Sequence, residues 1–254
     1  MRPWPVGADL PSLLPEPRRP ASVLRIAHRG GGAVERYGPD DLLSVAACGA
    51  HLVEFDLHVT GDDELVARHD PVVEIGGARA WLADHPLDEA LPWLERNQVP
   101  TVIGVIQAAR DAGLGLYADI KTLTFRSAER LAALLDQEGM AGRTILASVR
   151  SDIVARCAEV APEVPRAVLF ASTLEEPVQL ASSVGAHYVH PCWERLPHPD
   201  HVLADGWLDR VRANGLGVIC WHEERPEVIR GLFELGVDGI CTDRPDLLTE
   251  LAQE

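Results

Sequence analysis

Two acidic residues interrupt an apolar stretch early in the chain. Glu54 and Asp56 stand within LVEFDLHV at 52–59, a composition that predicts a buried strand. Residues two apart on a strand point to the same face, so the two carboxylates would lie together. Buried negative charges need a positive partner, and divalent cations such as Mg2+ and Ca2+ take oxygen ligands. The pair therefore predicts a metal site, with a buried salt bridge to an arginine as the alternative.

A predicted hairpin brings a histidine, His69, close to the two acidic residues. Residues 60–63 read TGDD, which predicts a turn, and ELVARHD at 64–70 predicts a second short strand. So short a connection allows only antiparallel pairing. The hairpin then brings His69 and Asp70 back towards its own start, and carboxylates beside an imidazole indicate a metal-assisted reaction.

Composition limits the kinds of partner. The 254 residues carry a formal charge of −16, which argues against a nucleic-acid surface or an anionic membrane face. A protein this acidic needs local positive charge, from a metal, Arg or Lys, to bind a phosphate. Five cysteines are spread without metal-site spacing, as expected of thiols in a reducing compartment. No secretory signal or membrane-length apolar run is apparent, so we expect a cytoplasmic protein without membrane insertion.

Strands and helices alternate along most of the chain. We expect a proline-rich leader over residues 1–22 and a single domain over 23–254, with an irregular insertion at about 71–98. Trp81 and Trp93 would either cover an apolar substrate group or fix that insertion. Eight parallel strands are predicted at 23–28, 51–58, 114–120, 144–149, 167–171, 187–190, 217–221 and 238–242. With helices between them, one near 200–213, they predict an α/β fold, a (β/α)8 TIM barrel with an extra hairpin arm. A doubly wound sheet is the competing architecture.

Polar side chains gather where these strands end. In a barrel, the carboxyl ends of the strands form the catalytic face. Lys121, the only lysine in the chain, is expected either to contact a phosphate or to pair with Asp119 or Glu54. Residues at or just beyond the strand ends are His28, Arg29, Glu54, Asp56, Asp119, Lys121, Trp221 and Asp243. Other histidines are interpreted as structural: His58 as surface or hairpin packing, and His187, His190, His198 and His201 as loop surface without a zinc pattern.

From His28 to its end, the chain resembles the glycerophosphodiester phosphodiesterases, as a divergent member of these phospholipase-C-like barrels. HRGGG at 28–32 is similar to the family's opening HRG, EFD at 54–56 to its E-x-D, and HD at 69–70 to its second histidine motif. Further similar segments are VPTVIGVIQAA at 99–109, DIK at 119–121 and GVDGICTDRPDLL at 236–248. Each motif alone is weak, but their common order is specific.

The resemblance implies metal-dependent hydrolysis of a small phosphodiester to a phosphomonoester, such as sn-glycerol 3-phosphate, and an alcohol. His28 and His69 would be the acid–base pair, a role that contributes about 10²–10⁴-fold. Mg2+ or Ca2+ would be bound by Glu54, Asp56 and Asp119. Arg29 and Lys121 would hold phosphate oxygens, and Trp221 would line the pocket. The attacking oxygen is either water or the substrate's own hydroxyl, which would form a cyclic phosphate first.

Three departures separate the chain from the family pattern. Asp40 and Asp41 stand where the family has P-E-N-T, and Asp119 replaces a glutamate whose reach is about 1.5 Å longer. His222, Glu223 and Glu224 follow Trp221 in place of small or amide residues. We expect a more acidic mouth and a substrate that carries a cationic or polyol group. The alternatives are phospholipase-D-like cleavage that releases a cyclic phosphate, and a catalytically impaired barrel that acts as a binding protein.

Overall fold

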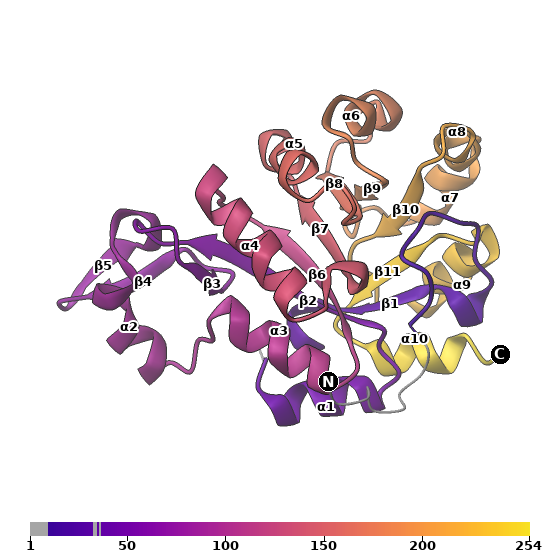
Figure 1. The fold of residues 1–254 in the computed structure, drawn as a ribbon. Helices are drawn as coiled ribbons and strands as arrows, with labels where there is room; N and C mark the ends of the chain where they lie inside the picture. The colour runs from indigo at the N-terminus through magenta and orange to yellow at the C-terminus, as the bar shows by residue number, and fades with distance from the viewer. Residues whose placement is uncertain (1–9, 33–34, 36) are drawn as a thin grey trace.

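Eight parallel strands close into a barrel in the computed structural model, which describes residues 10–32, 35 and 37–254 (Figure 1). Their order is β1-β11-β10-β9-β8-β7-β6-β2, and β1 also pairs with β2, so the sheet has no open edge there. This closure confirms the (β/α)8 barrel and rules out the doubly wound alternative. The strands are β1 Leu24–Ala27, β2 Leu52–Val59, β6 Gly115–Ile120, β7 Thr144–Ser148, β8 Arg166–Phe170, β9 Tyr188–Pro191, β10 Gly217–Cys220 and β11 Gly239–Thr242.

The predicted hairpin arm is present. Strand β3, Leu65–Ala67, pairs antiparallel with β2 through Leu57↔Ala67 and Val59↔Leu65. All eight residues of β2 are buried. Val53, Phe55, Leu57 and Val59 pack with buried residues of the helices, whereas Glu54 and Asp56 point into the barrel interior, so the strand alternates apolar and polar positions after Leu52.

Helices form the outer layer of the barrel (Figure 1). The predicted helix near 200–213 is two helices, because Gly206 has a φ of 75° that a right-handed helix cannot continue. The helices around the barrel are α1 Pro39–Ala47, α3 Val102–Asp111, α4 Phe125–Gln137, α5 Ser151–Val160, α6 Pro177–Val184, α7 Pro199–Ala204, α8 Trp207–Ala213, α9 Pro226–Leu235 and α10 Pro245–Leu251.

The insertion at 71–98 is ordered, contrary to prediction. It contains β4 Val72–Ile75, β5 Ala78–Trp81 and α2 Leu87–Arg96, and it lies beside β3 at one side of the barrel (Figure 1). Gly76 and Gly77 both have positive φ, which makes the tight turn of the β4–β5 hairpin. The Arg68 guanidinium lies 4.6 Å from the centroid of the Trp93 ring, so this tryptophan fixes the insertion, whereas Trp81 is 58% exposed.

Part of the proline-rich leader packs against the barrel. Residues 1–9 lie outside the described residues, but Leu13 is buried and its carbonyl accepts a hydrogen bond of 2.7 Å from the Tyr188 hydroxyl. Further along, Glu16 N–H donates to the Asp238 carboxylate at 2.8 Å. Tyr188 begins β9, so this segment lies at the amino ends of the strands. Over residues 10–32, 35 and 37–254, no helix is both long and apolar enough to cross a bilayer.

Candidate active site

Three buried carboxylates meet at the carboxyl ends of β2 and β6. Asp56 and Asp119 are paired across these neighbouring strands, and Glu54 lies one inward-facing position earlier on β2. One oxygen from each of Glu54, Asp56 and Asp119 lies within 4.8 Å of the others. The two-residue spacing of Glu54 and Asp56 therefore puts both on the interior face, as predicted. The shorter Asp119 side chain still reaches the cluster.

Two cations stand against this carboxylate cluster. Lys121 Nζ lies 2.5 Å from Asp119 Oδ2 and 2.9 Å from Asp56 Oδ1, and Arg29 Nε lies 3.4 Å from Asp56 Oδ2. Burial disfavours the Lys121 ammonium, but Asp119 and Asp56 outweigh it and raise its pKa. The predicted pairing of Lys121 with Asp119 is present, and these ion pairs hold its ammonium at the strand ends.

The carboxylates retain oxygens that no protein group satisfies. Glu54 Oε1 and Asp119 Oδ1 are buried without a hydrogen-bond partner. Burial raises the pKa of Glu54, and Asp56 and Asp119 raise it further; burial likewise raises the pKa of Asp119, against the opposing effect of Lys121. A divalent cation would compensate both the missing partners and the mutual repulsion. An oxygen-only donor set is also the set that Mg2+ and Ca2+ prefer, so these residues fit such an ion.

The segment after β1 turns sharply to present His28 and Arg29. It forms a short 3-10 helix, His28–Gly30, in which Arg29 has a φ of 48°, a left-handed value that few residues other than glycine adopt. The Arg29 N–H donates to Glu54 Oε2 at 2.8 Å. This bond fixes the strained turn against the carboxylate cluster, so the same glutamate positions the arginine and belongs to the possible metal site.

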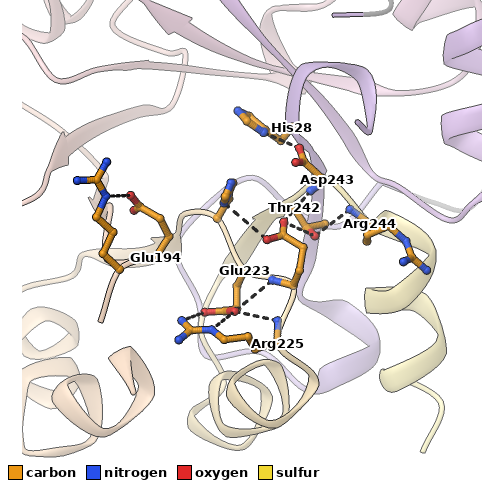
Figure 2. Close-up of polar contacts among 10 residues, drawn as sticks. His28, Glu194, Glu223, Arg225, Thr242, Asp243 and Arg244 are labelled. Carbon is orange, nitrogen blue, oxygen red and sulfur yellow. Dashed lines mark hydrogen bonds and ion pairs between the residues drawn. The ribbon is translucent and has the colours of Figure 1, made fainter. Parts of the chain in front are cut away.

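His28 is hydrogen-bonded to a residue near the C-terminus, Asp243. Its Nδ1 lies 2.7 Å from Asp243 Oδ1, just beyond the end of β11, whereas its Nε2 is buried without a partner (Figure 2). Burial lowers the pKa of His28 to about 4, although Asp243 acts to raise it. At neutral pH the imidazole is therefore neutral, with Nδ1–H donating to the carboxylate and Nε2 free to accept a proton.

His69 lies on the loop that follows β3, at the exposed rim of the site. Its backbone N–H donates to the Glu35 carboxylate, and its carbonyl accepts a hydrogen bond of 3.2 Å from His58 Nε2. The preceding residue ties this loop to the site, because the Arg68 N–H donates to the Asp56 carbonyl at 2.8 Å. His58 is buried within the hairpin, in agreement with the packing role predicted for it.

Aromatic rings form the opposite wall. The Trp221 ring, directly after β10, lies 4.9 Å from the His28 ring, and Lys121 Nζ lies 5.9 Å from the Trp221 ring centroid. His222 adds a second imidazole whose ring lies 5.2 Å from that of His28. Sequence reasoning gave His222 no functional role and left Asp243 without one, although its position at a strand end was the available signal.

His190 corrects one prediction. The side chain was expected on a loop surface, but it is fully buried inside the barrel, where Nδ1 bonds the Tyr117 hydroxyl and the ring lies 5.7 Å from that of Trp221. It lies on β9 two residues after Tyr188, and that spacing places both side chains on the interior face. The period-two pattern of this short strand was the missed signal.

One of the two glutamates expected at an acidic mouth is paired with an arginine. Glu223 is buried and pairs with Arg225 at 2.6 Å, and Glu224 Oε1 accepts a hydrogen bond of 3.0 Å from the Asp243 N–H (Figure 2). Glu223 is therefore paired within the loop after Trp221, whereas the side chain of Glu224 is still 35% exposed. The predicted preference for a substrate that carries a cationic or polyol group stays a prediction.

A closed (β/α)8 barrel with carboxylates, cations and an imidazole at its carboxyl ends defines an α/β-barrel enzyme. The model of the glycerophosphoryl diester phosphodiesterase family matches residues 40–247, and the chain belongs to this family. It is thus a phosphoric diester hydrolase by class. Glu54, Asp56, His69, Asp119 and Lys121 fall within the matched range, and His28 precedes it.

Known proteins resemble the chain over nearly its whole length. The glycerophosphodiester phosphodiesterase of Caldanaerobacter subterraneus subsp. tengcongensis is 25% identical over 249 residues, covering 91% of this chain and 98% of its own. A glycerophosphodiester phosphodiesterase structure from Parabacteroides distasonis has a TM-score of 0.72 at 21% identity, covering 90% and 95% of the two chains. A phosphodiesterase from Oleispira antarctica, solved with its product sn-glycerol-3-phosphate, has a TM-score of 0.71 at 17% identity, covering 90% and 96%. The two structures share the barrel fold.

Proposed function

We propose that the chain hydrolyses a glycerophosphodiester to a phosphomonoester, such as sn-glycerol 3-phosphate, and an alcohol. The observation that carries the proposal is the carboxylate cluster with unsatisfied oxygens beside the free Nε2 of His28. Family membership supports the reaction class, and the product bound by the Oleispira antarctica relative supports the nature of the phosphomonoester.

A divalent ion, Mg2+ or Ca2+, would be held by Glu54, Asp56 and Asp119. Bound there, it would neutralise charge on the non-bridging oxygens of the phosphodiester. Arg29 and Lys121 lie against the same carboxylates and supply fixed positive charge for the remaining phosphate oxygens. Two cations cannot balance three carboxylates and an anionic substrate, which is the electrostatic reason for the ion.

Proton transfer is assigned to the two histidines. His28 is neutral at physiological pH, so its Nε2 accepts the proton of the attacking oxygen while Asp243 stabilises the imidazolium that forms. His69, at the solvent-exposed rim, donates a proton to the leaving alkoxide and recovers it from water. Trp221 covers the bound substrate from the opposite wall and limits access of bulk water.

The proposal is tested by following release of glycerol 3-phosphate from glycerophosphocholine. EDTA-treated protein should be inactive, and Mg2+ or Ca2+ should restore turnover. Glu54→Gln removes a ligand charge and should weaken metal binding by about 100-fold or more. Glu64→Gln, which removes a surface partner of Arg130, is the matched control and should behave like wild type.

Two results would contradict the proposed metal-dependent hydrolysis. One is full activity in EDTA, and the other is a Glu54→Gln protein that binds metal and turns over normally. Phosphorus NMR of the products distinguishes the attacking group. A transient cyclic phosphate indicates attack by the substrate's own hydroxyl, and direct appearance of the monoester indicates attack by water.

A further inference from the structure

A second group of potential metal ligands lies where α7 begins, outside the phosphodiester site. His198, Asp200 and His201 each place one ligand atom within 4.8 Å of the others. The two imidazole rings are stacked, with centroids 4.6 Å apart and planes inclined by 13°. We propose that these three residues bind a divalent transition-metal ion such as Zn2+.

The buried carboxylate of Asp200 is the feature that favours a bound cation. The residue is only 8% exposed, and its Oδ1 is buried without a hydrogen-bond partner. Its ion-pair contact is with the His201 imidazole, whose Nε2 lies 3.7 Å from Oδ2, beyond hydrogen-bonding distance. Burying a carboxylate oxygen unpaired costs free energy, and a bound cation would offset that cost.

A glycine in the neighbouring helix makes room for this carboxylate. Gly231 lies inside α9, where a Cβ would come 2.5 Å from Asp200 Oδ2 and 3.1 Å from its Cγ. Glycine in a helix interior is less favourable than alanine. The fold therefore accepts two unfavourable features at one point, and both serve to place the Asp200 carboxylate beside two imidazoles.

The donor set specifies the kind of ion. Two imidazole nitrogens and one carboxylate oxygen suit Zn2+, Ni2+ or Cu2+, whereas the oxygen-only cluster of Glu54, Asp56 and Asp119 suits Mg2+ or Ca2+. With three protein ligands, a tetrahedral ion would keep one position for water or a further ligand. The chain would thus hold two different metals at separate places.

The position of this site also gives it a structural consequence. The loop that joins β9 to α7 is tied to the rim of the active site, because Arg225 Nη1 donates to the Leu196 and Pro197 carbonyls at 2.8 and 3.0 Å and pairs with Glu223. An ion held by residues 198–201 would fix the end of this loop. Its expected effect is greater thermal stability on metal binding, through preferential binding to the folded state.

Zn2+ binding to the full-length protein tests the proposal independently of phosphodiesterase activity. The protein is stripped of metal, supplied with excess Mg2+ to fill the carboxylate cluster, and titrated with Zn2+ by calorimetry. His28, His222 and Asp243 can also gather around an ion, so the measured quantity is the difference between variants. We expect His198→Ala and His201→Ala each to bind one equivalent fewer than wild type, or to bind it about 100-fold more weakly.

His85→Ala is the matched control, because His85 pairs with Glu89 on the insertion and belongs to no such cluster. It should keep the wild-type stoichiometry and the Zn2+-dependent rise in melting temperature. Gly231→Ala should weaken Zn2+ binding by about tenfold, since its methyl group displaces the carboxylate, with folding checked by circular dichroism. Unchanged Zn2+ binding in both His198→Ala and His201→Ala would overturn the proposal, as would a wild-type protein that binds no Zn2+.

Discussion

Asp243 orients His28, because its carboxylate accepts a hydrogen bond of 2.7 Å from the imidazole Nδ1–H. Asp243→Asn should reduce kcat/KM by about 100-fold, because a neutral amide no longer stabilises the imidazolium formed during proton transfer. The pKa of His28 is about 4, and Asp243 raises it, so the acid limb of the pH–rate profile should move to lower pH in the variant. Asp246→Asn, beside the exposed Arg244, is the control. A rate loss without movement of the acid limb would indicate a purely structural role for Asp243.

Replacing Lys121 by a neutral residue should strengthen metal binding and slow turnover. Its ammonium contacts Asp56 Oδ1 and Asp119 Oδ2 at 2.9 and 2.5 Å, so it competes with a divalent ion for their charge. Lys121→Gln should bind Mg2+ about tenfold more tightly, a change of about 1.4 kcal/mol, while kcat falls through loss of a phosphate contact. Calorimetry and product assays measure the two effects, with Arg130→Gln as control. Tighter binding together with unimpaired kcat would remove Lys121 from the phosphate site.

At the scale of a single strand, β6 positions Asp119 only if its first residue is small. A Cβ at Gly115 would meet the Leu52 side chain and lie 2.6 Å from the Arg143 carbonyl oxygen. Gly115→Ala should therefore lower the free energy of unfolding by about 1–3 kcal/mol, because backbone on the adjacent segment must shift. Gly142→Ala meets no atom within 4 Å and should be neutral or stabilise by about 0.4–1 kcal/mol. Urea unfolding measures both, and equal stabilities would show that the strand start adapts without strain.

Strand periodicity explains which elements the sequence could predict. The spacing of Glu54 and Asp56 predicts a shared face because a strand repeats every two residues, and the short turn after β2 predicts an antiparallel β3. The break between α7 and α8 depends on the backbone of Gly206, whose left-handed φ is one of several conformations open to a glycine. The insertion at 71–98 is ordered by a small buried cluster that includes Val73, Leu82 and Leu94, and local composition does not reveal that these side chains meet.

At the scale of the whole barrel, closure creates contacts that no local pattern contains. His28 and Asp243 are separated by 215 positions and meet only because β11 is adjacent to β1. The sequence could therefore place His28 and Asp243 at strand ends, but it could not predict the hydrogen bond between them. His190 shows the same limit: its neighbour Tyr117 comes from β6, across the barrel interior, and a histidine-rich stretch viewed in isolation suggests surface. The candidate site is predictable as a list of strand-end residues, and its pairings require the closed sheet.

Closure also makes the stability of the barrel sensitive to acid. Burial lowers the pKa of His190 to about 3 and that of His51 to about 3. Below the ordinary histidine pKa of about 6.5 the unfolded chain takes up protons that the folded chain excludes, so each histidine reduces stability as pH falls. The loss is about 1.4 kcal/mol per pH unit per histidine, or about 2 kcal/mol each by pH 5. Buried carboxyl groups with raised pKa values, such as Asp238, instead increase stability as the pH falls. Their contribution is removed by comparing variants that share the same carboxyl groups.

His190→Gln isolates this effect, because glutamine does not titrate while every carboxyl group stays in place. Between pH 6 and pH 4.5, wild type should lose about 1.4 kcal/mol per pH unit more than His190→Gln, as measured by urea unfolding in EDTA. Tyr117→Phe removes the hydroxyl partner but leaves the imidazole buried, so its curve should run parallel to that of wild type. Parallel curves for wild type and His190→Gln would instead mean that His190 accepts a proton within the folded barrel, through water entering from the active-site end.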